Sequence, residues 1–310
     1  MNLKKPYFWD LKKPNYISYI LTPFTLPIIL RNFFFNLLKK KNFSKIKTIC
    51  IGNIYLGGTG KTPLTIKIFE ILKKHNHKVA TVKKFYKNQI DEQLLLKEAT
   101  SAIISKSRKN ALYEGIKNKY EILLFDDGLQ DIEIDYDKKI VCFKINNWIG
   151  NGQLIPAGPL REKISSLKRF DALFLNGSNN NIHEYTEQIK KINPNIKIFK
   201  SKYRIKDIYK YDLNSEYLIF SGIGNPKDFK SLMLENNFKI KKEVLFNDHF
   251  NYSSKNLEDI LNLAKNEKLK IMTTSKDYIK LPKYYKKEIS CLDIDLEIEN
   301  QNELIDFLIN

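Results

Sequence analysis

The stretch Gly57-Gly58-Thr59-Gly60-Lys61-Thr62 decides the fold of this 310-residue chain. It follows a β-branched run, Thr48–Asn53, and precedes a helical pattern over 63–75, which is the setting of a phosphate-binding loop. Glycines let backbone N–H groups converge on phosphate oxygens, and the start of the helix adds positive potential. The Lys61 ammonium can reach the β- and γ-phosphates, and Thr62 can ligate Mg²⁺. The motif departs from the strict pattern at Tyr55, where a glycine is usual, and the extra glycine of the run compensates.

A second motif lies at the end of an apolar run. Ile122-Leu123-Leu124-Phe125 is followed by Asp126 and Asp127, as in a Walker B strand that holds Mg²⁺ through a carboxylate or an attached water. Two adjacent carboxylates at a strand end also occur in simple turns. The spacing from Lys61 is typical of sheets in which the two strands are neighbours. We therefore predict that ATP, with Mg²⁺ on Thr62, Asp126 and Asp127, occupies this edge of the sheet.

Short β-branched runs alternate with helical stretches after residue 47, which indicates βαβ units and a mainly parallel sheet. We expect an α/β fold of the P-loop NTPase type, with helices on both faces of the sheet, and a smaller α/β domain after it. The predicted division is a segment at 1–45, a P-loop catalytic domain at 46–205 and a C-terminal domain at 206–310.

The first 50 residues are basic and apolar. They hold nine lysines, Arg31 and one acidic residue, Asp10. A helix starting near Pro27 would place Asn32, Asn36 and Lys39/Lys40 on one stripe and Phe, Ile and Leu on the rest. The apolar run carries two prolines and is interrupted by Arg31, so it predicts an amphipathic helix docked on an anionic membrane surface rather than a spanning helix. A helix packed on its own domain is the alternative.

Two carboxylate-containing pairs are candidates for acid–base chemistry. Asp91-Glu92 opens a predicted helix, and Asp248-His249 follows a predicted strand. A histidine paired with a carboxylate can accept a proton from a hydroxyl near neutral pH. The residues alone leave open whether His249 is catalytic or a surface histidine. The other three histidines are expected to be structural or solvated, and they are His75, His77 and His183.

The overall charge says little about partners. The formal net charge is +18, but only five of the 53 basic residues are arginine, and Asn and Ile are also abundant. A codon bias would produce this composition, and nucleic-acid readers favour arginine for bidentate contacts. We therefore expect no nucleic-acid partner. The three cysteines are far apart and form no CxxC, which argues against a disulfide framework or a cysteine-rich zinc site.

Several segments together resemble one family, the tetraacyldisaccharide 4′-kinases of Gram-negative bacteria. The matching segments occur in family order and span most of the chain. They are GNIYLGGTGKTP (52–63), DEQLLL (91–96), DDGLQ (126–130), GNGQLIPAGPLRE (150–162), GIGNPKDF (222–229), NDHFNY (247–252) and TTSKDYIK (273–280). The segment 150–162 is especially specific, because common P-loop ATPases lack it.

The resemblance implies a function and roles for the candidate residues. ATP would donate its γ-phosphate to the 4′-hydroxyl of an acylated disaccharide 1-phosphate lipid, giving lipid IVA on the way to lipopolysaccharide. The site would lie in the cleft between the two domains, at the cytoplasmic face of the inner membrane. Lys61 and Thr62 would be ligands of the phosphates and Mg²⁺, and Asp126 with the catalytic Asp127 would be the acidic pair after the Walker B strand. Asp91 and His249 would form a dyad that activates the sugar hydroxyl. Gln130 and Arg161 lie in matching motifs without a role that we can assign.

The chain departs from the family at several places. The family has Ser-Arg-Gly-Tyr-Gly after its second strand, where this chain has Lys83-Lys84-Phe85-Tyr86-Lys87. A phenylalanine at a glycine position blocks close backbone approach, and a lysine for an arginine loses the bidentate fork. The family's DDGLQH and TTEKD become DDGLQ-Asp131 and TTSKD. These changes concern the substrate cleft and spare the phosphate loop.

Two further functions compete with the kinase. A membrane-associated P-loop switch ATPase often has a signature lysine just before the two glycines, where this chain has Leu56. A non-catalytic nucleotide-binding relic of the kinase would not be expected to keep all of the candidate residues. Those retained are Lys61, Thr62, Asp91, Asp126, Asp127 and His249.

Overall fold

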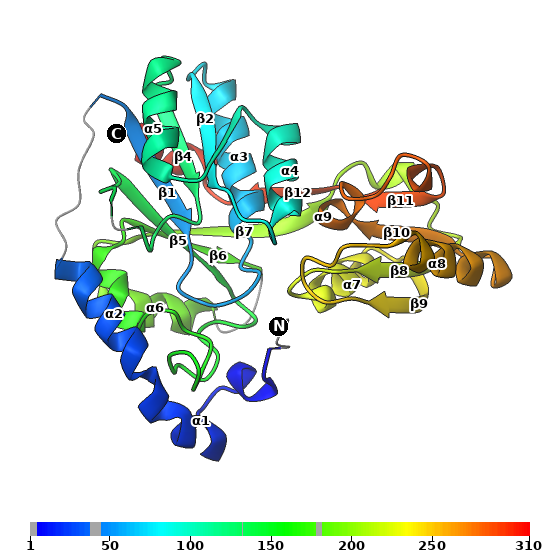
Figure 1. The fold of residues 1–310 in the computed structure, drawn as a ribbon, viewed down its shortest axis with the longest axis horizontal. Helices are drawn as coiled ribbons and strands as arrows, with labels where there is room; N and C mark the ends of the chain where they lie inside the picture. Colours follow the sequence, from blue (N-terminus) through cyan, green and yellow to red (C-terminus); the bar gives the residue numbers. More distant parts are fainter. Residues whose placement is uncertain (1–4, 38–44, 132, 178–181) are drawn as a thin grey trace.

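A computed structural model describes residues 5–37, 45–131, 133–177 and 182–310, and it contains two sheets (Figure 1). The larger sheet has eight strands, parallel except at one edge. Their order is β12 (Ile294–Ile298), β7 (Lys197–Ile205), β6 (Ala172–Asn176), β5 (Lys138–Lys144), β1 (Lys47–Gly52), β4 (Ile122–Asp126), β2 (Val79–Lys84) and β3 (Ala102–Ser105). The predicted P-loop-type fold is confirmed, and β1 and β4 are neighbours as expected.

Helices cover both faces of the larger sheet. Residues of β1 alternate between the two cores, with Ile49 and Ile51 on one side and Cys50 on the other. The first side packs against α3 (Lys61–Lys74) and α10 (Gln301–Ile309). The second side packs against α5 (Arg108–Lys117) and α6 (Ile182–Ile192). The helix α4 (Ile90–Ala99) contacts both α3 and the short helix α9 (Ser275–Tyr278).

The smaller sheet has four parallel strands in the order β11 (Ile289–Leu292), β10 (Lys270–Thr274), β8 (Glu216–Ser221) and β9 (Lys239–Leu245). Its helices are α7 (Pro226–Glu235), α8 (Ser254–Asn266) and the short α9 (Ser275–Tyr278). Short 3₁₀ turns complete the chain, at Tyr7–Asp10, Thr22–Thr25, Ile164–Arg169, Ile208–Lys210 and Tyr285–Lys287. This domain extends sideways from the larger one (Figure 1).

The two domains are joined by a pair of strands rather than by one linker. The strand β7 leads out of the larger sheet, and β12 returns antiparallel to it, with Ile294 opposite Ile205 and Ile298 opposite Ser201. The strand β12 and helix α10 therefore lie with the larger sheet, which differs from the expected C-terminal domain at 206–310. The physical reason is packing, because Leu296 and Leu304 complete the core beneath α3.

The N-terminal segment forms α1 (Tyr16–Leu21) and α2 (Leu26–Leu37) at the edge of the larger domain (Figure 1). Ile28 and Ile29 pack against the domain, and the Asn32 side-chain amide donates to the Arg161 carbonyl at 2.9 Å. The opposite stripe of α2 is exposed and apolar, and it comprises Leu26, Leu30, Phe33, Phe34 and Leu37. Asn32 therefore faces the protein, while the predicted Lys39 and Lys40 lie outside the described residues and the Asn36 side chain is not described.

Candidate active site

The phosphate-binding loop has the backbone geometry that its glycines predict. Gly57 and Gly60 have φ values of 133° and 88°, in the region that side chains rarely adopt. A Cβ on Gly60 would lie 2.7 Å from the Asn176 amide nitrogen and 2.8 Å from the Tyr203 hydroxyl. Gly60 directly precedes α3, so the loop delivers its N–H groups to the start of that helix.

Neighbouring segments hold this loop in place. The buried Asn53 side chain donates to the Thr59 hydroxyl at 2.9 Å and to the Gly57 carbonyl at 3.2 Å. The segment 150–162 runs beside the loop, with the Arg161 N–H bonded to the Ile54 carbonyl at 2.7 Å. These hydrogen bonds hold residues 53 and 54, which lead into the loop, against the loop itself and against the segment 150–162.

The two carboxylates after β4 lie at the loop, as the sequence predicts. The Thr62 hydroxyl donates to Oδ2 of Asp126 at 2.9 Å, while the buried Oδ1 of Asp126 has no hydrogen-bond partner among the described residues. Oδ1 of Asp127 is 3.6 Å from Nζ of Lys61 and 3.4 Å from Nη1 of Arg161. Burial raises the pKa of the Asp127 carboxyl, but Lys61 and Arg161 outweigh it and the pKa lies below its usual range.

Asp91 and His249 meet across the cleft between the domains. Asp91 is in the first turn of α4 and is 1 % exposed, and His249 follows β9. Nδ1 of His249 lies 2.8 Å from Oδ1 and 2.9 Å from Oδ2 of Asp91. Burial alone would raise the pKa of the Asp91 carboxyl. The hydrogen bond from His249 and the charges of Lys276 and Lys280 outweigh burial, so this pKa lies below its usual range.

The His249 backbone is held in a left-handed conformation. Its φ is 59°, and its N–H donates to the Gly222 carbonyl at 3.0 Å. The Gly222 N–H in turn donates to the buried carboxylate of Asp277 at 3.0 Å, and Asp277 also accepts from the Tyr252 hydroxyl at 2.8 Å. The smaller domain therefore builds a rigid support for the imidazole.

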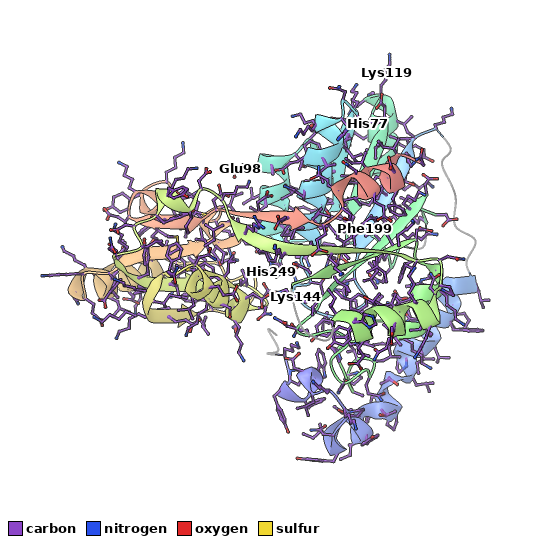
Figure 2. The ribbon with its side chains drawn as sticks, turned by 180° about the vertical axis from the view of Figure 1, so that it is seen from behind. His77, Glu98, Lys119, Lys144, Phe199 and His249 are labelled. Carbon is purple, nitrogen blue, oxygen red and sulfur yellow. The ribbon has the colours of Figure 1, made fainter. Side chains whose placement is uncertain are left out.

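The phosphate-binding loop and His249 line the same cavity, which has a volume of about 470 Å³. Besides the Asp91–His249 pair, two further contacts between the domains lie beside this cavity. An ion pair joins Lys144 at the end of β5 to Asp228 in α7, and a Cβ on Gly224 would lie 3.3 Å from the Gly58 nitrogen. Figure 2 labels Lys144 and His249, which come from the larger and the smaller domain. The site is thus assembled from both domains.

A family model described as tetraacyldisaccharide-1-P 4′-kinase matches residues 19–310. The chain belongs to this family. It is accordingly an ATP-dependent kinase of lipid A biosynthesis, and the resemblance predicted from the motifs is confirmed.

Relatives and a solved structure agree with this assignment. The tetraacyldisaccharide 4′-kinase of Pelagibacter ubique is 47% identical over 311 residues, covering 100% of this chain and 98% of the relative. That of Rickettsia typhi is 33% identical over 324 residues, covering 98% and 97%. A crystal structure of Aquifex aeolicus LpxK in complex with ATP has a TM-score of 0.70 at 24% identity, covering 95% of this chain and 100% of that one. The latter shows that the fold is shared.

Gln130 and Arg161, which lacked a role in the sequence, now have defined contacts. The Gln130 side-chain amide donates to the Asn53 carbonyl at 3.1 Å and to Glu162 at 2.9 Å. It therefore links the phosphate-binding loop to the segment 150–162. Arg161 faces Asp127 with its side chain and α2 with its carbonyl.

Sequence reasoning missed three charged residues of the site. Lys83 is buried between Asp126 and Glu92, and Lys276 reaches Glu92 from the smaller domain at 3.1 Å. Burial lowers the pKa of Lys276, but Glu92, with Asp248 and Asp91, raises it overall. Lys83 alone left a signal in the sequence, because it is a charge that directly follows the apolar run 79–82. Lys144 left no such signal.

Proposed function

We propose that the cleft transfers the γ-phosphate of ATP to the 4′-hydroxyl of a tetraacyldisaccharide 1-phosphate, with the residues described above in the roles given below. The observation that carries the proposal is that one cavity is lined by both the phosphate-binding loop and His249, whose Nδ1 is paired with the buried Asp91. The first group suits the donor and the second suits an acceptor hydroxyl. Such a transfer needs placement and charge neutralisation more than covalent chemistry by the protein.

The donor half of the site is the loop from Gly57 to Thr62. Its N–H groups and the start of α3 offer positive potential to the phosphates, and the Lys61 ammonium adds a positive charge. In the structure this lysine lies 3.6 Å from Asp127. We infer that Lys61 contacts the phosphates when ATP binds, and that Asp127 then keeps Arg161 as its ion-pair partner.

The residues beside the loop fit Mg²⁺. Asp126 presents a buried carboxylate oxygen that has no hydrogen-bond partner in the part of the chain that the structure describes. This carboxylate lies next to the Thr62 hydroxyl and is followed by Asp127. Among the described residues no cluster of three or more His, Cys, Asp or Glu side chains forms a self-contained metal cage. Magnesium bound by one or two carboxylates, waters and phosphate oxygens needs no such cage. When bound it neutralises charge on the phosphates, and we propose Thr62, Asp126 and Asp127 as the residues that hold it.

The acceptor half is the dyad. An Nδ1–H that donates to Asp91 fixes the tautomer of His249 and leaves Nε2 free to accept a proton. Nε2 then takes the proton of the sugar hydroxyl as the hydroxyl oxygen attacks the γ-phosphorus. The bond between the γ-phosphorus and the β,γ-bridging oxygen breaks, and ADP leaves with that oxygen. Asp91 remains ionised and stabilises the imidazolium that forms.

The lipid acceptor is expected at a membrane surface. The exposed stripe of α2 and the exposed Tyr16, Tyr19, Ile20 and Phe24 form an apolar face at the N-terminus. Among the described residues, one helical stretch, Tyr16–Phe35, is long and apolar enough to cross a membrane by length and composition. Because the other side of α2 packs on the protein, we favour docking at the cytoplasmic face of the inner membrane. We expect no nucleic-acid partner.

The test is a transfer assay with γ-labelled ATP, Mg²⁺ and tetraacyldisaccharide 1-phosphate in detergent. Wild type should label the lipid, and Lys61→Ala should not. Lys74→Ala, an exposed lysine at the end of the same helix, is the matched control and should retain activity. ATP hydrolysis by wild type without any labelled lipid would contradict the proposal and favour a switch ATPase. Binding of ATP without hydrolysis would favour a non-catalytic relic.

A further inference from the structure

The Lys83 side chain is buried in the site, between Asp126 and Glu92. It lies near the end of β2 and is 1 % exposed. The strands β2 and β4 are parallel neighbours, and their register places Lys83 directly opposite Asp126. Its Nζ lies 2.8 Å from Oδ2 of Asp126 and 2.6 Å from Oε2 of Glu92.

Glu92 contacts Lys83 of its own domain and also Lys276 of the smaller domain. Its second oxygen, Oε1, lies 3.1 Å from Nζ of Lys276 in α9. Charges of alternating sign therefore run from Asp126 through Lys83 and Glu92 to Lys276. Glu92 also directly follows Asp91 in the first turn of α4. Contacts that fix the position of Glu92 therefore also fix the neighbouring Asp91, whose carboxylate pairs with His249.

The contacts of Asp126 are divided between its two oxygens. Oδ2 accepts from both Thr62 and Lys83, whereas Oδ1 has no partner in the described protein. A fixed positive charge at 2.8 Å offsets the negative charge that Asp126 would offer to a divalent cation.

We propose that Lys83 is a positioning residue with two opposed effects on the kinase reaction. It ties Asp126 to Glu92 and so aligns the Mg²⁺-binding edge with the Asp91–His249 dyad. By occupying Oδ2 of Asp126 it also weakens the binding of Mg²⁺ at that carboxylate. The inference rests on the proposed function of the cleft. A purely structural lysine would not produce effects of opposite sign.

The experiment measures nucleotide binding and catalysis separately. Binding of a fluorescent ATP analogue is titrated with excess Mg²⁺ and with EDTA, and the ratio of the two dissociation constants gives the enhancement by Mg²⁺. Lys83→Met should raise this enhancement about tenfold, because one cation beside the metal site is removed. In the lipid transfer assay, kcat should fall about 10- to 100-fold, as for a supporting residue beside a metal site. Lys74→Met, on the exposed end of α3, should change neither quantity.

A charge-matched variant separates this role from simple loss of folding. Lys83→Met leaves Asp126 and Glu92 without their shared cation, so the single variant is vulnerable to misfolding. The double variant K83M/E92Q removes one charge of each sign, and it should fold while keeping the raised Mg²⁺ enhancement and the low kcat. If the single variant does not fold, the double variant decides.

An unchanged or lowered Mg²⁺ enhancement in the folded variants would overturn the inference, and so would an unchanged kcat. The binding titration needs no lipid acceptor. Failure of the proposed function would instead appear as wild-type protein that leaves the lipid unlabelled, so the two failures are distinguishable.

Discussion

Nδ1 of His249 lies 2.8 Å from Oδ1 of Asp91, although 158 residues separate them in the chain and each belongs to a different domain. The pair therefore exists only while the smaller domain is closed over the larger one. Asp91 is nearly inaccessible and is fixed by α4, whereas the imidazole is 21 % exposed and faces the cavity. Binding of the donor and activation of the acceptor are thus joined in one closed arrangement.

Removing either member of the dyad should affect the chemical step more than ATP binding. His249→Ala and Asp91→Asn should each lower kcat by about 10²- to 10⁴-fold, the usual contribution of a positioned general base. The dissociation constant of ATP should change little, because neither residue belongs to the phosphate-binding loop. Steady-state kinetics with the lipid acceptor and equilibrium binding of ATP check the two parts. His183→Ala is the control, since that imidazole is 86 % exposed. Full activity of His249→Ala would contradict the role.

The Lys144–Asp228 ion pair should contribute to closing the cleft. It joins the end of β5 to α7, and Asp228 is also held by the Asn225 amide at 2.9 Å. Lys144→Met and Asp228→Asn should each weaken ATP binding, because the closed form becomes less populated. A double-mutant cycle on the ATP dissociation constant should give a coupling of about 1 kcal/mol, as for partly exposed charge pairs in contact. Purely additive effects would show that the pair does not stabilise the closed form.

Asp91 should also make stability depend on pH. Its pKa is depressed in the folded state, so the unfolded chain binds the proton more readily. Its contribution to the free energy of unfolding is therefore complete above the unfolded pKa of about 3.9 and is lost as the pH falls through the lower folded value. Asp91→Asn should be about 1–3 kcal/mol less stable than wild type at pH 7, because His249, Lys276 and Lys280 lose a buried acceptor.

Urea unfolding at pH 7 and at pH 3.5 measures this dependence. The stability gap between wild type and Asp91→Asn should narrow at the lower pH. A substitution of an exposed aspartate, Asp306→Asn, serves as the reference for general effects of acid. A gap that is equal at both pH values would mean that the carboxyl of Asp91 titrates alike in the folded and unfolded chain.

Part of the site could be predicted from local sequence alone. Lys61, Thr62, Asp126 and Asp127 follow two strands that are neighbours in the sheet, and the carboxyl ends of parallel strands meet at one edge. The pairing of Asp91 with His249 could not be worked out in this way, because it depends on how two domains close. Only the resemblance of the motifs to a family supplied it.

The other features of the site and fold could not be predicted, because lysine is abundant in the chain and because they depend on contacts between distant segments. With 53 basic residues in the chain, Lys144 and Lys276 do not stand out from the other lysines, and only Lys83 is marked, by its place directly after an apolar run. The return of β12 to the larger sheet was missed because a short alternating strand fits the edge of either sheet. The helical periodicity places Asn32 on a polar stripe with Asn36, Lys39 and Lys40, but it cannot show that Asn32 binds the Arg161 carbonyl, 129 residues away in the chain.

The exposed apolar stripe of α2 should determine binding to membranes. Phe33 and Phe34 are 58 % and 59 % exposed, so replacing both by serine removes apolar area without opening a cavity in the core. The variant should bind anionic lipid vesicles at least about tenfold more weakly, since each phenylalanine loses its burial in the interface. Sedimentation with vesicles measures this, and Tyr284→Ser, an exposed aromatic of the smaller domain, is the control.

The same variant separates docking from catalysis. The packed side of α2 is untouched, because Ile28 and Ile29 still contact the domain and Asn32 still binds the Arg161 carbonyl. ATP binding should therefore be unchanged, and the loss should appear as a higher KM for lipid presented in vesicles. With the lipid dispersed in detergent the difference from wild type should shrink. An equal loss of kcat in vesicles and in detergent would indicate that the stripe supports the cleft and does not dock on the bilayer.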